Sequence, residues 1–104
     1  MNDKLYIVVR ADLGPGLKLP QACHALRAFV DEQPELEREW FLGANNLVVL
    51  EVPDEPALAA LRARSEARGL RSAIFREPDL GDAVTALALE PRAKGLVRRL
   101  PLAG

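Results

Sequence analysis

The residues that could do chemistry gather around positions 5–30, where a buried strand, a glycine-rich turn and a helix follow one another. The strand covers residues 5–9, the turn is the Gly-Pro-Gly sequence at 14–16, and the helix is predicted to begin near Leu19 or Pro20. A helix that follows such a turn directs free backbone N–H groups and the positive end of its dipole at one place. This arrangement suits a phosphate or a developing oxyanion, so we expect the functional site there.

Polar side chains on either side of this turn could bind or react with a substrate. Arg10 follows the strand and is the arginine that we expect to contact a phosphate. Gln21, in the predicted first helical turn, could donate to a substrate carbonyl or phosphate, or could face solvent. His24 is placed to reach the site and take part in catalysis, although a lone histidine is commonly a packing residue. Its neighbour Cys23 points about 100° away, which argues against a Cys–His catalytic pair.

A second group of polar residues lies near the end of the chain. Residues 77–82 form an acidic turn with the sequence EPDLGD, and Thr85 opens the last predicted strand. Asp79 and Asp82 could bind substrate or accept a proton, or they could serve only the turn, because Asp beside Gly is common in turns. Thr85 could orient a water molecule, or it could be a β-branched residue that simply suits a strand.

The apolar pattern predicts the elements that must position these residues. Strands are predicted at residues 5–9, 47–52, 70–76 and 84–89, and helices at about 19–32, 34–40, 57–68 and 91–100. Right-handed crossovers make the first two strands parallel neighbours. We therefore predict an α/β fold, a three-layer sandwich whose four-stranded mixed sheet has the order 2-1-4-3, with strand 4 antiparallel and helices on both faces.

Alternation in the last strand predicts which of its side chains share a face of the sheet. One face is predicted to carry Thr85, Leu87 and Leu89, and the other Val84, Ala86 and Ala88. Both faces are then covered, so the strand is interior. Ligands of such sheets bind at the carboxyl ends of parallel strands, where residues 10–20 must lie.

Composition and charge limit the class of protein. The 104 residues suffice for a single domain, residues 1–104, and one cysteine excludes an intrachain disulfide, so we expect a reducing, cytoplasmic location. The sequence contains no apolar run of about eighteen residues, so it predicts no membrane span. The net charge of −1 gives no overall attraction to a polyanion. Basic residues at 62–76 and 92–99 could still form one basic face for RNA, or a solvated surface of mixed sign.

Four sequence blocks resemble the type 2 peptidyl-tRNA hydrolase family, in the family's order and along nearly the whole chain. The blocks are VVRADL at 8–13, QACHA at 21–25, VPDEPAL at 52–58 and TALALEP at 85–91. In the family they read roughly VVRTDL, QCSHA, VPDEEEL and TVLAIGP. The resemblance implies a divergent bacterial member that hydrolyses the ester between a peptide and the terminal ribose of tRNA, usually as a homodimer and without a metal or cofactor.

The resemblance also implies roles for individual residues. Thr85 would hold the attacking water molecule, and Asp82 or Asp79 would accept its proton. Lys18, with backbone N–H groups at the helix start, would stabilise the oxyanion of the tetrahedral intermediate, and Gly16 in the preceding turn would bind substrate.

Two departures from the family keep a second function open. The family has a lysine four residues before the glutamine of its QCSHA block, a position that Leu17 occupies here, with Lys18 one step away. The longer DAGxTQ loop of the family is replaced by the sequence at 77–82. A chain that has lost these groups could be a catalytically inactive module that binds RNA or protein on the same fold. A scaffold that contacts a partner through the acidic helix at 34–40 is a third possibility.

Overall fold

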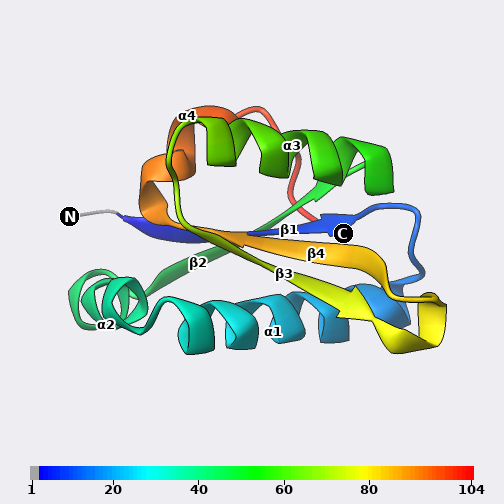
Figure 1. Ribbon diagram of the computed structural model, residues 1–104, viewed down its shortest axis with the longest axis horizontal. Helices are drawn as coiled ribbons and strands as arrows, with labels where there is room; N and C mark the ends of the chain where they lie inside the picture. Colours follow the sequence, from blue (N-terminus) through cyan, green and yellow to red (C-terminus); the bar gives the residue numbers. More distant parts are fainter. Residues whose placement is uncertain (1–2) are drawn as a thin grey trace.

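The computed structural model of the protein describes residues 3–104. Its elements are β1 (Lys4–Arg10), α1 (Pro15–Glu32), α2 (Pro34–Gly43), β2 (Asn46–Val52), α3 (Glu55–Ala67), β3 (Ser72–Glu77), η1 (Pro78–Leu80), β4 (Ala83–Leu89), η2 (Pro91–Ala93) and α4 (Lys94–Val97) (Figure 1). The two η elements are short 3-10 helices.

The sheet has the order β2-β1-β4-β3, as the sequence predicts. β1 and β2 run parallel, whereas β4 runs antiparallel to both β1 and β3. The side chains of β1 enter two separate cores, with Leu5, Ile7 and Val9 on one side of the sheet and Tyr6 and Val8 on the other. The continuous apolar sequence of β1 therefore reflects burial on both faces, and the predicted α/β fold is confirmed.

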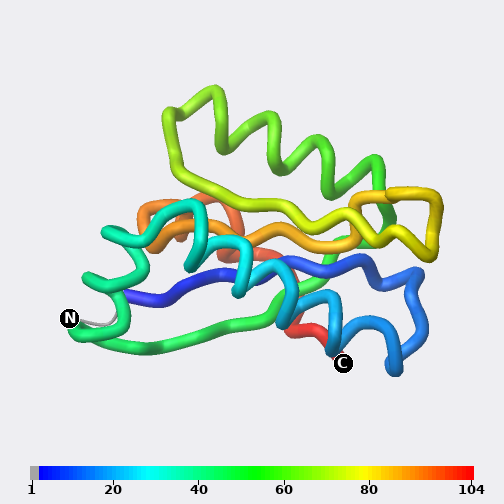
Figure 2. The backbone as a smooth tube through the Cα atoms, turned by 60° about the horizontal axis from the view of Figure 1, so that its bottom comes forward, coloured from blue at the N-terminus to red at the C-terminus, as the bar shows by residue number. Residues whose placement is uncertain are grey.

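Helices cover both faces of the sheet, with α1 and α2 on one side and α3 and α4 on the other (Figure 1). Phe29 of α1 is buried in the first core, and Leu58 and Leu61 of α3 are buried in the second. The last residues of the chain lie beside the outer strand β2, where Leu102 bridges Leu50 (Figure 2). Within residues 3–104, every helix is too short or too polar to cross a membrane.

The start of α1 differs from the sequence prediction. The helix begins at Pro15, not near Leu19 or Pro20, and Pro20 lies inside it. A proline at the first helical position loses no hydrogen bond, because that N–H would have no helical acceptor. Pro20 removes only one bond, the one that its N–H would donate to the Gly16 carbonyl, and the following turns continue the helix. The turn that precedes the helix is therefore shorter than predicted.

Other element bounds differ by a few residues. α2 continues to Gly43, beyond the predicted end at residue 40, and β3 begins at Ser72, after the predicted start at residue 70. The helix predicted at 91–100 is divided into η2 and the short α4, which ends at Val97. Gly69, with a φ of 70°, follows α3 as a left-handed residue after the helix C-cap, a conformation that glycine adopts readily.

A β-bulge in β4 corrects the predicted alternation of its side chains. Phe75 of β3 pairs with Ala86, and the next residue, Arg76, pairs with Val84, so Thr85 is an extra residue in β4. Thr85 and Ala86 both face α1, while Val84 packs on the α3 side. The faces predicted for Thr85 and Val84 are therefore wrong, because alternation by twos fails where one strand has an unpaired residue.

Candidate functional site

Three hydrogen-bonded side chains link α1, β3 and β4, and we call Thr85, Gln21 and Glu77 the relay. The Thr85 hydroxyl donates to Gln21 Oε1 at 2.5 Å, and Gln21 Nε2 donates to Glu77 Oε1 at 2.7 Å. The bulge turns Thr85 toward α1, whose buried Gln21 faces the sheet, and Glu77 is the last residue of β3. Folding thus joins a hydroxyl and an amide that are 64 positions apart in the sequence.

The chemistry of the groups determines the direction of these hydrogen bonds. An ionised carboxylate can only accept, so Glu77 receives an N–H of the Gln21 amide, and the amide oxygen faces Thr85. The hydrogen bond from Gln21 lowers the pKa of Glu77, and the Asp79 backbone N–H and the nearby His24 act in the same direction, against a smaller effect of desolvation. Glu77 is therefore ionised at neutral pH and able to accept a proton.

The members of the relay differ in their access to solvent. Thr85 is fully buried and Gln21 is 1% exposed, whereas Glu77 is partly exposed. On the same strand as Glu77, Phe75 stacks against the ring of His24, with the ring centroids 4.4 Å apart. His24 itself is exposed on α1. The Glu77 carboxylate and the His24 imidazole are thus both accessible to a ligand.

The start of α1 is a separate feature of the region. Gly14 is the N-cap residue, and the backbone N–H groups of Leu17 and Lys18 both donate to its carbonyl. Gly16 is exposed in the first turn, and its N–H has no acceptor among residues 3–104. Gln21 lies about 9 Å along the helix axis from the helix start, which corrects its predicted place in the first turn. The Gly16 N–H therefore lies at the start of α1, and Gln21, the relay residue on this helix, lies further along it.

Lys18 lies on the β2 side of α1. Its amino group donates to Glu51 Oε2 at 3.3 Å and to the Gly104 carbonyl at 3.2 Å. Glu51 belongs to β2, at the edge of the sheet opposite β3, which carries Glu77. The structure therefore directs the Lys18 amino group away from the relay.

Arg10 lies at the end of β1, on the face that α3 covers. Its guanidinium donates to the Asp12 carboxylate through Nε at 2.9 Å and Nη2 at 3.0 Å, and through Nη1 to the Val84 carbonyl at 3.3 Å. The Asp12 hydrogen bond raises the pKa of Arg10 and lowers that of Asp12. Glu55 of α3 lies 4.0 Å from the same guanidinium. These contacts hold the backbone just before Thr85 and leave the side chain on the face opposite the relay.

Asp79 and Asp82 lie in the turn between β3 and β4, and both are exposed. Their hydrogen bonds to Glu77 come from backbone groups, with the Asp79 N–H 3.2 Å from Glu77 Oε2 and the Asp82 N–H 3.0 Å from the Glu77 carbonyl. Asp82 is left-handed with a φ of 61°, next to Gly81 with a φ of 64°. Turn geometry accounts for both aspartates, and through it they hold the Glu77 carboxylate in place.

Glu77 is a candidate acid that the sequence interpretation did not include. It opens the EPDLGD turn, but only the two aspartates of that turn are candidates in the sequence prediction. A tight turn between antiparallel strands sets the residue before it opposite the residue after it, and Glu77 pairs with Ala83, two positions from Thr85. This pairing in the predicted hairpin is the sequence signal that could have added Glu77 to the candidates.

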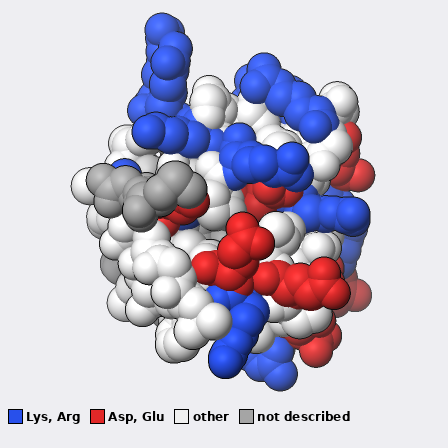
Figure 3. Space-filling model, turned by 90° about the vertical axis from the view of Figure 1, so that its left-hand side faces the viewer, with Lys and Arg blue, Asp and Glu red and all other residues white. Residues whose placement is uncertain are grey.

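The basic residues that follow β4 do not surround the relay. The segment at 92–99 begins about one strand length, roughly 20 Å, from Thr85. Figure 3 shows that end of the molecule, where Lys and Arg side chains gather in the upper part and acidic side chains lie below them. The basic residues at 92–99 therefore lie away from the Thr85 hydroxyl.

Possible metal-ligating side chains are dispersed. Cys23 is exposed on α1, next to His24, whose ring is stacked on Phe75. Within residues 3–104, the His, Cys, Asp and Glu side chains form no group of three or more that could hold a metal ion.

Comparison with known proteins gives a family and a fold. The family model described as peptidyl-tRNA hydrolase PTH2 matches residues 3–101, which include the whole relay. A solved structure of a protein of unknown function from Agrobacterium tumefaciens strain C58 is similar over 100% of this chain and 99% of its own, with a TM-score of 0.70 and 18% sequence identity. At this level of identity, the structural similarity shows the fold alone.

Proposed function

Since the chain belongs to the peptidyl-tRNA hydrolase PTH2 family, we propose that it hydrolyses the ester between a peptide, or an N-blocked amino acid, and the terminal ribose of tRNA. The observation that carries this proposal is the relay. The relay presents the ionised carboxylate of Glu77 at the surface. This carboxylate is hydrogen-bonded to the buried Gln21 amide, which in turn accepts a hydrogen bond from the buried Thr85 hydroxyl. Ester hydrolysis needs such a group to take a proton from water.

In the proposed reaction, Glu77 accepts a proton from a water molecule that attacks the ester carbonyl carbon. The bond to the ribose oxygen then breaks, and Glu77 returns the proton to that oxygen. Thr85 and Gln21 are positioning residues, because they orient the carboxylate without contacting the substrate. The developing oxyanion is stabilised by the start of α1, where the helix dipole is positive and the Gly16 N–H has no acceptor within residues 3–104.

The test of this function is cleavage of N-acetylaminoacyl-tRNA by the purified chain. We expect release of deacylated tRNA and the N-acetyl amino acid at a rate proportional to the protein concentration and unchanged by a chelator. The released label is measured in the acid-soluble fraction after short incubations. Substrate that stays intact in the presence of well-folded protein would contradict the proposal.

The pH dependence of kcat should reveal which group accepts the proton. The pKa of Glu77 is lowered from its ordinary value of 4.5, so the carboxylate stays ionised, and able to accept a proton, until the pH falls below that value. We expect a flat rate from neutral pH down to that range, and then a loss. Replacing Gln21 with methionine removes the largest cause of the low pKa and should move this loss to higher pH. A rate for the unmodified chain that already falls at a pH well above 4.5 would contradict this role of Glu77.

A second function, a catalytically inactive module that binds RNA, is favoured by one observation. Thr85 and Gln21 have almost no exposed surface, and Lys18 is paired with Glu51, so these polar groups are bonded inside the protein. Such a module would leave the ester intact but bind the acceptor end of tRNA in a salt-sensitive complex. Binding titrations at about 50 and 200 mM salt, run beside the cleavage assay, distinguish the two functions.

A further inference from the structure

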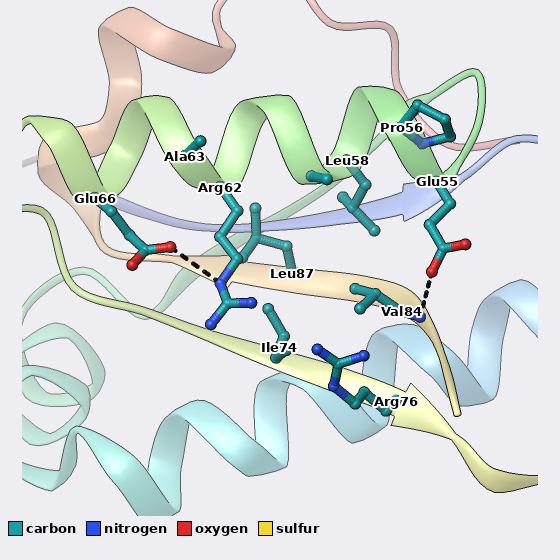
Figure 4. A pocket seen from close by; sticks show the side chains of 11 residues that line it. Glu55, Pro56, Leu58, Arg62, Ala63, Glu66, Ile74, Arg76, Val84 and Leu87 are labelled. Atoms are coloured by element: carbon teal, nitrogen blue, oxygen red, sulfur yellow. Dashed lines mark hydrogen bonds and ion pairs between the residues drawn. The ribbon is translucent and has the colours of Figure 1, made fainter. Parts of the chain in front are cut away.

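A groove lies between α3 and the outer strand β3, on the face of the sheet opposite the relay (Figure 4). Its cavity volume is about 390 Å³, within the range of roughly 300–1,000 Å³ that is typical of sites for small ligands. α3 packs mainly over the middle strands, so the outer strand β3 is left incompletely covered on this side. The groove is therefore a consequence of where the single long helix of this layer lies.

The floor of the groove is apolar. Leu58 of α3, Ile74 of β3, and Val84 and Leu87 of β4 all line it. Val84 reaches this face because the bulge turns it away from the neighbouring Thr85. The floor therefore suits an aliphatic chain or an aromatic ring.

Two guanidinium groups lie over this floor, on either side of Ile74 (Figure 4). Arg62 Nε lies 3.3 Å from Glu66 Oε1, and Arg76 Nη1 donates to the Asp82 carbonyl at 3.3 Å. Within residues 3–104, each guanidinium has only this one partner, although it carries five N–H donors. Most of these donors are thus free to bind a ligand.

The two acidic residues of the groove lie at its ends and are already bonded. Glu55 Oε2 accepts the Val84 backbone N–H at 2.8 Å, and Glu66 is the partner of Arg62. Figure 4 shows them on opposite sides of the two arginines. The formal charges of the lining cancel, but the middle of the groove presents guanidinium groups above apolar side chains.

We propose that this groove binds a small amphipathic anion, an aliphatic or aromatic body that carries one carboxylate or phosphate group. The apolar body would lie on the leucine, isoleucine and valine floor, where burial of its surface is favourable. The anionic group would accept N–H bonds from Arg62 and Arg76, whose planar forks match both carboxylate and phosphate oxygens. Binding here is independent of the proposed hydrolysis, since the relay lies on the other face of the sheet.

The test is a titration of the isotope-labelled full chain, followed by the chemical shifts of its backbone amides. Octanoate and phenyl phosphate are the two probes, and each represents one source of the anion. We expect saturable shifts at Ile74, Val84 and Leu87, with a dissociation constant below about 1 mM for at least one probe. Saturation by octanoate alone assigns the site to carboxylates, and saturation by phenyl phosphate alone assigns it to phosphates.

Variants test whether binding depends on the proposed contacts or is nonspecific. Arg62→Gln combined with Arg76→Gln should weaken binding at least tenfold, and Ala63→Glu, which adds a negative charge to the lining, should weaken it as well. Arg64→Gln is the matched control, because Arg64 is exposed on the same helix but does not line the groove. The proposal is overturned if neither probe saturates, if 1-octanol binds as well as octanoate, or if the double variant keeps the original affinity.

Discussion

Replacing Glu77 with glutamine is expected to lower kcat for N-acetylaminoacyl-tRNA by about 100-fold or more, the usual contribution of a general base. Glutamine keeps the size of the side chain and can still bond to Gln21, but it cannot take a proton from water. KM should change little, because the proposed role of Glu77 is in the chemical step. Steady-state kinetics of ester cleavage measures both constants.

The two aspartates of the same turn are matched controls for this variant. Asp79→Asn and Asp82→Asn each remove one exposed carboxylate near Glu77 while keeping the backbone bonds of the turn. Asparagine also tolerates the left-handed backbone at position 82. We expect both variants to keep most of the activity. Loss in Asp82→Asn with full activity in Glu77→Gln would return the role to the acid predicted from the sequence.

Thr85→Val is expected to lower kcat by about 10- to 100-fold, because small displacements of a catalytic group are costly. Valine matches the shape of threonine but offers no hydroxyl, so the buried Gln21 oxygen loses its donor. The amide is then free to turn, and the Glu77 carboxylate loses its orientation. The free energy of unfolding should fall by about 1–3 kcal/mol, the cost of an unsatisfied buried acceptor, which thermal unfolding measures.

A double variant separates a role through Glu77 from a direct role of Thr85. If Thr85 acts only by positioning Glu77, Thr85→Val should cause little further loss in the Glu77→Gln background. Losses that multiply would support the sequence prediction that Thr85 itself holds the water molecule. Thr85→Ser keeps the hydroxyl and should recover most of the wild-type kcat, whereas a purely steric role would leave the serine variant as impaired as an alanine variant.

The sheet order could be predicted because each inference rested on a sequence feature that the native fold also requires. Residues 5–9 are apolar at every position, and only a central strand between two helical layers buries all of them. The crossover through α1 and α2 makes β1 and β2 parallel, and the short turn at 78–82 makes β3 and β4 antiparallel. These constraints are local or follow from general handedness, so a single sequence contains them.

The candidate site was predicted less completely, because it depends on long-range pairing and on one irregularity. Thr85 and Gln21 were both candidates, but their contact exists only because β4 has a bulge, and no residue type marks that bulge in the sequence. Pro20 resembles a helix start as much as Pro15 does, which shifted the predicted helix and misplaced its N-terminus. Lys18 could reach either flank of α1, and the position of Glu51 decides which.

The extra residue in β4 means that a change of chain length can affect the chemistry without affecting the architecture. Deleting Val84, just before Thr85, would pair Thr85 with Arg76 and restore an uninterrupted ladder with β3, and the four strands could keep their neighbours. The hydroxyl would then emerge on the side that α3 covers, beyond the reach of any amide on α1. In an alignment of related chains, a one-residue gap at the position of Val84 would therefore indicate that the threonine hydroxyl lies on the other face of the same fold.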